Sequence, residues 1–144
     1  MARAYLQTLL AFVALALLVP GGGQAQSIRD IRVGHEGGRT RGVVELDQDL
    51  TYTVFYLSSP PRIVVDISGL SLESRPDTRG SANGLVRNVR LGQFNDNITR
   101  VVFDLNQSAD LADSFFLEPR GGAAYRLVID MVAGQGSPLS LIHI

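Results

Sequence analysis

The stretch Arg62-Ile-Val-Val-Asp-Ile (residues 62–67) recurs later in the chain as Arg126-Leu-Val-Ile-Asp-Met (residues 126–131). Successive side chains of a β-strand point to opposite faces, so each copy presents two different faces. One face is apolar and is predicted to lie in the core, with Ile63, Val65 and Ile67 in the first copy and Leu127, Ile129 and Met131 in the second. The opposite face reads Arg, Val, acid, with Arg62, Val64 and Asp66 matched by Arg126, Val128 and Asp130.

Two further blocks repeat in the same order, which indicates an internal duplication. Residues 28–34 (IRDIRVG) match residues 86–92 (VRNVRLG) at an offset of 58. Six positions between Arg41 and Gln48 match positions between Arg100 and Gln107 at an offset of 59. The copies at 62–67 and 126–131 are 64 residues apart, because the second half has extra residues in the loop at 120–124.

Short β-branched runs between turn residues predict an all-β fold, since no stretch sustains a helical apolar period. The expected strands are 28–35, 40–46, 51–57, 62–68, 86–93, 98–105, 114–118 and 125–132. The turn-rich connector 69–84 joins the repeat halves 28–68 and 86–132, and a short helix after Ser71 is considered there. Each half is too small to fold alone, so we expect the halves to pack on each other as two four-stranded sheets of a β-sandwich.

Four of these strands present the same Arg-apolar-acid face. In the other matched pair Val44, Leu46, Phe103 and Leu105 are expected in the core, leaving Arg41, Val43, Glu45, Arg100, Val102 and Asp104 opposite. Between antiparallel neighbours the Arg of one strand stands opposite the acid of the next, which predicts a ladder of ion pairs around a row of valines. The other interpretation is binding, because guanidinium groups grip carboxylates or sugar hydroxyls. The candidate binding residues are Arg41, Arg62, Arg100 and Arg126.

Composition limits the classes of function. The 144 residues carry 13 basic side chains, all Arg, against 14 acids, for a net charge of -1. General attraction to nucleic acid or to an anionic membrane is therefore not expected. The chain has no Cys, which excludes disulfides, thiol nucleophiles and Cys-ligated zinc.

The motifs of common catalytic sites are also missing from the sequence. The two histidines, His35 and His143, are far apart, and His35 is expected to be an exposed residue at a strand end. No Gly-x-Ser-x-Gly elbow is present. One hypothesis is that Asp104 and Asp130 form a glycosidase carboxylate pair. Their repeat copies, Glu45 and Asp66, favour a structural role instead. We therefore predict no catalytic residue, no metal site and no cofactor in these residues.

The first 25 residues have the organisation of a secretory signal peptide. Arg3 precedes an apolar run from Leu9 to Val19, and Gly23-Gln24-Ala25 provides the small residues required before a cleavage site. Eleven apolar residues span only about 16 Å as a helix, too little for a stable membrane anchor. A secreted chain without Cys favours the periplasm.

With these blocks established, Ile31-Arg-Val-Gly, Arg100-Val-Val-Phe-Asp-Leu and Tyr125-Arg-Leu-Val-Ile-Asp resemble the AMIN domain of periplasmic N-acetylmuramoyl-L-alanine amidases. The resemblance covers residues 28 to about 132, so the AMIN-like domain is set at 26–132. It implies two four-stranded sheets that bind peptidoglycan and localise the host amidase, often to the division site. Envelope or division proteins are further partners that it suggests. The alternative that it leaves open is a protein-interaction module of a secretin or other envelope complex.

The end of the chain departs from that family layout. The zinc-dependent catalytic domain of the family would follow a linker after Val132, so zinc is expected only in that domain and not among these residues. Residues 133–137 resemble the start of the linker, and residues 138–144 (PLSLIHI) are expected to fit neither a linker nor strand pairing. We therefore expect the sequence to be a fragment of a longer amidase.

Overall fold

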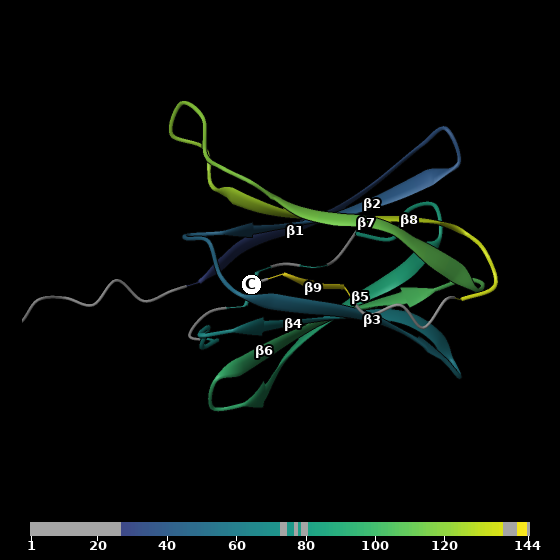
Figure 1. Cartoon of the computed structure of the whole chain (residues 1–144), viewed down its shortest axis with the longest axis horizontal. Helices are drawn as coiled ribbons and strands as arrows, with labels where there is room; N and C mark the ends of the chain where they lie inside the picture. The colour runs from purple at the N-terminus through teal and green to yellow at the C-terminus, as the bar shows by residue number, and fades with distance from the viewer. Residues whose placement is uncertain (1–26, 73–74, 77, 79–80, 137–140, 144) are drawn as a thin grey trace, which may run out of the picture.

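The computed structural model describes residues 27–72, 75–76, 78, 81–136 and 141–143, and these residues form strands and loops without any helix (Figure 1). The first four strands are β1 (Ile28–Glu36), β2 (Arg39–Leu46), β3 (Tyr52–Ser58) and β4 (Pro61–Ser68). The remaining strands are β5 (Val86–Asn95), β6 (Ile98–Leu105), β7 (Ala109–Leu117), β8 (Tyr125–Ala133) and β9 (Leu141–His143). The all-β prediction is confirmed. The predicted signal peptide lies outside the described residues.

Two antiparallel sheets pack face to face as a sandwich (Figure 1). We name them sheet A, with strand order β1-β2-β8-β7, and sheet B, with order β5-β6-β4-β3-β9. The predicted sandwich is confirmed, but the expectation that each repeat half forms its own sheet is wrong. The β3–β4 hairpin of the first half pairs with β6, and the β7–β8 hairpin of the second half pairs with β2.

This exchange of hairpins is the same in both repeat halves. When each of strands β1 to β8 is replaced by its repeat counterpart, the order of sheet A becomes the order of sheet B without β9. The exchange gives β2, β4, β6 and β8 a neighbour on both sides, so that most of their backbone groups are paired within a sheet. It also ties the two halves together, because neither sheet is complete with one half alone.

Seven of the eight predicted strands agree with the structure to within two residues at each end. The exception is β7, which begins at Ala109 rather than Ser114. A register shift between Leu111 and Asp113 places an extra residue in this strand, and such a bulge interrupts the alternation of apolar and polar side chains. The alternation of side chains therefore does not predict where β7 begins.

The connector between the halves borders the strands of both sheets. The Leu70 carbonyl accepts a hydrogen bond from the Thr99 hydroxyl at 2.8 Å, and the Ser81 hydroxyl donates to the Ile31 carbonyl at 3.2 Å. The described residues of the connector contain no helix, and the rest of the region considered for one (73–74, 77 and 79–80) lies outside the described residues.

The expectation that residues 138–144 do not pair is wrong for Leu141–His143. These residues form β9, antiparallel to β3, with Leu141 opposite Val54 and His143 opposite Tyr52. Because β3 would otherwise be the edge of sheet B, its outward backbone groups are available to an added strand.

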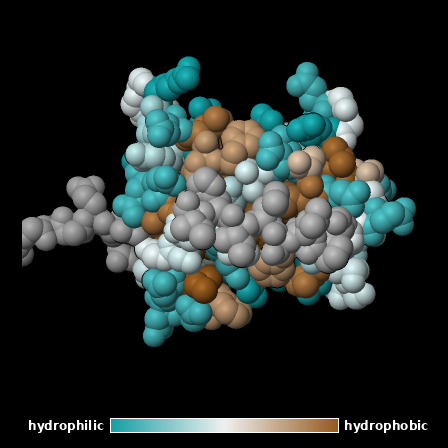
Figure 2. Space-filling model, in the orientation of Figure 1, coloured by the Kyte–Doolittle hydropathy of each residue, from teal (hydrophilic) through white to brown (hydrophobic). Residues whose placement is uncertain are grey.

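The core lies between the sheets, as the alternation predicts. All ten residues assigned to the core face are buried: Val44, Leu46, Ile63, Val65, Ile67, Phe103, Leu105, Leu127, Ile129 and Met131. Figure 2 shows hydrophobic side chains toward the middle of the molecule and hydrophilic ones gathered at the ends of the sheets. Phe103 fills the space above Gly42 of the other sheet, where a Cβ atom would lie 2.8 Å from its ring.

Candidate functional site: the Arg-acid ladders

The outer face of each sheet carries the predicted ladder. In sheet A, β2 and β8 align Arg41 with Asp130, Val43 with Val128, and Glu45 with Arg126. In sheet B, β4 and β6 align Arg62 with Asp104, Val64 with Val102, and Asp66 with Arg100. In each ladder a pair of aligned valines therefore lies between two rungs, each of which places an arginine opposite an acid. The predicted alignment is confirmed.

One rung of each ladder closes as a bidentate ion pair. The Arg41 guanidinium donates from Nε and Nη2 to the two oxygens of Asp130, both at 2.7 Å. Its repeat counterpart Arg100 donates in the same way to Asp66, at 2.7 and 2.8 Å. Two parallel N–H···O bonds fix the plane of each guanidinium, so these two arginines are held in place on the surface.

The acid of the other rung is paired from the edge strand instead. Arg90 of β5 donates to both oxygens of Asp104 at 2.7 and 2.8 Å, and Arg32 of β1 pairs with Glu45. Arg62 donates to the Pro60 carbonyl at 2.8 Å, and the buried Nε of Arg126 has no hydrogen-bond partner. The described residues show no ion pair at Arg62 or Arg126.

The strand order divides the candidate arginines between the two outer faces. The four candidate arginines do not converge, because Arg41 and Arg126 lie on sheet A and Arg62 and Arg100 lie on sheet B. On one face, the two rungs are four residues apart along the strand, which is roughly 13 Å. Arg100 and Arg126 are not the partners of Asp104 and Asp130: Arg90 pairs with Asp104, and Arg39 and Arg41 pair with Asp130.

Aromatic rings flank the fixed guanidinium groups. The Arg100 guanidinium lies 3.9 Å from the centre of the Phe94 ring and 5.8 Å from that of Phe55. On sheet A the Arg41 guanidinium lies 5.9 Å from the centre of Phe115. The sequence predicts that one ring of each aromatic pair faces the core. Indeed Tyr56, next to Phe55, is buried, and Phe116, next to Phe115, packs edge-on against Tyr52 at 5.2 Å.

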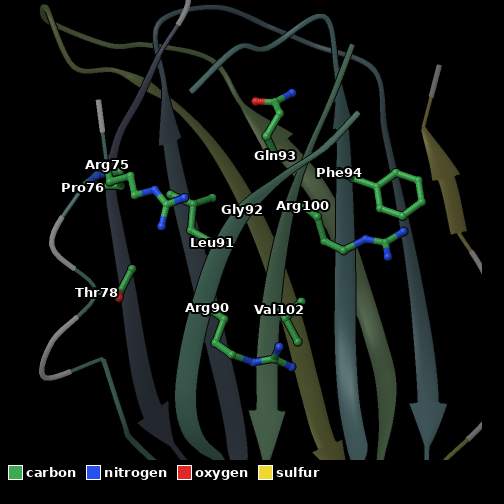
Figure 3. Close-up of a pocket in the computed structure, with 10 residues that line it drawn as sticks. All are labelled: Arg75, Pro76, Thr78, Arg90, Leu91, Gly92, Gln93, Phe94, Arg100 and Val102. Carbon is green, nitrogen blue, oxygen red and sulfur yellow. The ribbon is translucent and has the colours of Figure 1, made fainter. Parts of the chain in front are cut away.

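Two shallow grooves lie at repeat-related places beside these arginines. The first, of about 520 Å³, contains Gly92 of β5 between the connector residues Arg75 and Pro76 on one side and Phe94 on the other (Figure 3). The second, of about 560 Å³, is lined by Gly34, His35, Glu36, Gly37, Arg39 and Arg41. Gly34 and Gly92 are repeat copies, as are Arg41 and Arg100. We name the first the Gly92 groove and the second the Gly34 groove.

Sequence reasoning missed the edge-strand residues of this site. Arg32, Arg90, Gly34 and Gly92 all belong to the repeated block 28–34 and 86–92, so a signal was present in the sequence. It was not recognised because the strands β1 and β5 lack the Arg-Val-acid pattern of the central strands. Phe94 lies two residues after that block and carries no repeat signal, since its counterpart is Glu36.

The two carboxylates considered as a glycosidase pair do not converge. Asp104 and Asp130 lie on different sheets and are each engaged by arginine, so they do not form a converging carboxylate pair. The described residues contain no group of three or more His, Asp or Glu side chains able to hold a metal ion. His35 is exposed near the end of β1, as predicted, and its Nδ1 lies 2.9 Å from the Thr40 hydroxyl.

The ladders predict a loss of stability in acid. Hydrogen bonds from Arg41 lower the pKa of the Asp130 carboxyl, and those from Arg90 lower the pKa of Asp104. A carboxyl whose folded pKa lies below its unfolded value, about 3.9, stabilises the fold above that value. This stabilisation is lost as the pH falls through the folded pKa. We expect urea midpoints to be flat from pH 7 to 5 and to decline below about pH 4. The Asp104→Asn/Asp130→Asn variant should decline less steeply, and an equal decline would contradict this assignment.

The part of the chain that the structure describes includes no helix of the length and apolarity needed to cross a membrane.

Comparison with known proteins agrees with this architecture. The sequence model of the AMIN domain matches residues 30–121. N-acetylmuramoyl-L-alanine amidase AmiC of Escherichia coli is 36% identical over 107 residues, which are 70% of this chain and 25% of that protein. The chain thus spans about a quarter of the length of the relative that it matches. The family expected from the repeated blocks is confirmed, and the chain belongs to the AMIN domain family.

Proposed function

We propose that this domain is a noncatalytic module of a periplasmic N-acetylmuramoyl-L-alanine amidase, which binds peptidoglycan and holds the amidase at the cell wall during division. The observation that carries the proposal is the pair of outer faces, each with a fixed, partly exposed guanidinium beside an aromatic ring. The similarity to an amidase over 70% of the chain supports the class of the parent protein.

The chemistry of the outer faces suits peptidoglycan. Its stem peptides offer carboxylates and its sugars offer hydroxyls and apolar ring faces. The guanidinium of Arg41 is half exposed and that of Arg100 about one third exposed, so both retain N–H groups for a ligand. With a net charge of -1, the chain has no general attraction for anionic polymer, so recognition depends on these positioned groups.

The rest of the proposal concerns the parent protein. The signal peptide at residues 1–25 directs the chain to the periplasm, and hydrolysis belongs to a zinc-dependent domain outside these residues. Division or envelope proteins are further proposed partners. A stable membrane anchor and nucleic-acid binding form no part of this function.

Co-sedimentation with purified sacculi tests this function. We expect the chain secreted with its own leader to pellet with sacculi at low salt. The Arg41→Ala/Arg100→Ala variant should lose most of this binding, because it removes the fixed guanidinium from both faces. If the wild-type chain stays in the supernatant while a known wall binder pellets, the proposed function is wrong.

The chain provides a matched control for charge. Arg29 and Arg87 are also repeat copies, on the same edge strands as Gly34 and Gly92 but roughly 16 Å away. Arg29→Ala/Arg87→Ala removes the same charge and should bind sacculi as the wild type does. Melting temperatures of both variants separate binding from stability. A variant at Arg41 and Arg100 that loses stability but binds unchanged in its folded fraction would mean that the ladders are only structural.

The second candidate function is docking to a secretin or other envelope complex. The observation in its favour is β9, which shows that the edge of sheet B accepts an added strand. The corresponding edge of sheet A, at β7, is the natural place for a partner strand. In that case substitutions on the outer faces would leave partner binding unchanged, whereas a proline in β7 would abolish it.

A further inference from the structure

We propose that the two faces are not equivalent: the Gly92 groove takes the carboxylate-bearing stem peptide of peptidoglycan, with Phe94 against its apolar part, and the Gly34 groove does not. This inference rests on the proposed function and names the site and the ligand chemistry within it. It starts from a difference between two places that the duplication made equivalent.

The floor of the Gly92 groove is open backbone. A Cβ atom built on Gly92 would have nothing within 4 Å, and its φ is not in the region that favours glycine. The fold itself therefore does not require glycine here, and glycine in a strand interior lowers stability. Such a position is typical of a site where a ligand approaches the backbone closely.

The walls of the groove are cationic and apolar. In Figure 3 Arg75 lies on one side of Gly92, while Arg100 and Phe94 lie on the other. None of the described residues that line the groove is acidic. Asp104 and Asp66 pair with Arg90 and Arg100 from outside the lining and counter their charge, so the excess positive charge among the described lining residues is that of Arg75. This charge is complementary to a carboxylate ligand.

Phe94 supplies the apolar part of the site. Its side chain is 56% exposed, the largest exposed fraction among the large apolar residues described. The Arg100 guanidinium, 3.9 Å from the ring centre, holds this exposed ring beside the charged groups. A ligand that combines a carboxylate with an apolar surface contacts both groups at once.

The Gly34 groove has the same floor but different walls. Glu36 stands at the position of Phe94 and His35 at that of Gln93. Arg39 and Arg41 both donate to the single carboxylate of Asp130, so their charge is countered by Asp130 and Glu36. A carboxylate ligand therefore meets an acidic side chain there and finds no exposed aromatic ring.

Repeat-matched substitutions test this asymmetry. The probes are a soluble disaccharide tetrapeptide released from peptidoglycan, the same compound with amidated carboxyls, and a tetramer of N-acetylglucosamine. Isothermal titration with the purified chain should give binding of the first probe. Gly92→Leu, which fills the groove, should weaken it at least tenfold, and Gly34→Leu should change it less than twofold. Amidation should weaken binding, and the peptide-free tetramer should bind weakly.

Phe94→Glu gives the Gly92 groove the residue of its counterpart and should also weaken binding at least tenfold. Because Phe94 is exposed, this variant keeps the test decisive even if Gly92→Leu fails to fold. Equal losses for the two glycine variants, a larger loss for Gly34→Leu, or unchanged binding with Phe94→Glu would overturn the inference. If wild-type binding to sacculi persists in those cases, the proposed function stands and only the site is wrong. If the wild type binds neither sacculi nor the disaccharide tetrapeptide, both fail.

Discussion

Replacing Phe103 with alanine is expected to lower the free energy of unfolding by about 3–5 kcal/mol, as for other large buried side chains. Phe103 is fully buried on β6 and its ring reaches the opposite sheet, where it lies over Gly42 of β2. The truncation leaves a cavity at the contact between the two sheets, and the backbone of β2 cannot fill it. Equilibrium unfolding in urea measures the effect.

The duplication supplies the control for this contact. The repeat counterparts of Gly42 and Phe103 are Val101 and Val44, so the other copy has two valines where this one has a glycine and a phenylalanine. Gly42→Val alone forces a methyl group into the ring and should cost about 1–3 kcal/mol. The double variant Gly42→Val/Phe103→Val should be more stable than the two single effects predict. Simple additivity would contradict a direct contact between the two residues.

The second large effect is expected when Asp130 loses both of its arginines. The Asp130 side chain is only 1% exposed and accepts three hydrogen bonds from Arg39 and Arg41, at 2.7 to 2.9 Å. The Arg39→Ala/Arg41→Ala variant leaves a carboxylate with little contact to water. Breaking a buried ion pair is strongly destabilising, but both arginines are about half exposed, so water reaches part of the vacated space. We expect a loss of about 2–3 kcal/mol at pH 7.

An amide at position 130 distinguishes charge from packing. In an Asp130→Asn background, removal of the two arginines should cost less than about 1 kcal/mol, because no buried charge remains. The deficit with Asp130 present should also shrink as the pH falls, since protonation neutralises the stranded carboxyl. Urea unfolding at pH 7 and pH 4 measures both effects. Equal losses in the two backgrounds would show that Arg39 and Arg41 act by packing alone.

Much of the fold is predictable from periodicity and repetition. The alternation in residues 62–67 and 126–131 identifies the core face and the ladder face. Side chains of a strand alternate between its two faces, so only one orientation of each strand buries all of its apolar residues. The assignment of strands to sheets is not predictable in this way. Both arrangements of the hairpins bury the same faces, and the choice depends on long-range pairing of β2 with β8 and of β4 with β6.

The site shows the same division. The ladders follow from residue types along one strand, and the sequence predicts them with their valine row. The partners of Asp104 and Glu45 come from edge strands whose bulged register shifts the alternation, at Val86/Asn88 and at Ile28/Asp30. The Gly92 groove is lined in part by the connector, and both grooves include residues of an edge strand. The repeated block 28–34 and 86–92 marks the arginines and glycines involved, but nothing local to it specifies their partners or the groove walls.

The proposed function requires that the outer faces of this AMIN domain contact peptidoglycan. The most direct test is an NMR titration of the isotope-labelled chain with soluble disaccharide tetrapeptide released from sacculi. We expect the largest shift changes at the backbone amides of Gly92, Phe94 and Arg100, and none at buried residues such as Val65. Changes confined to the edge strand β7, or no changes at saturating probe when sacculi also fail to bind, would contradict the claim.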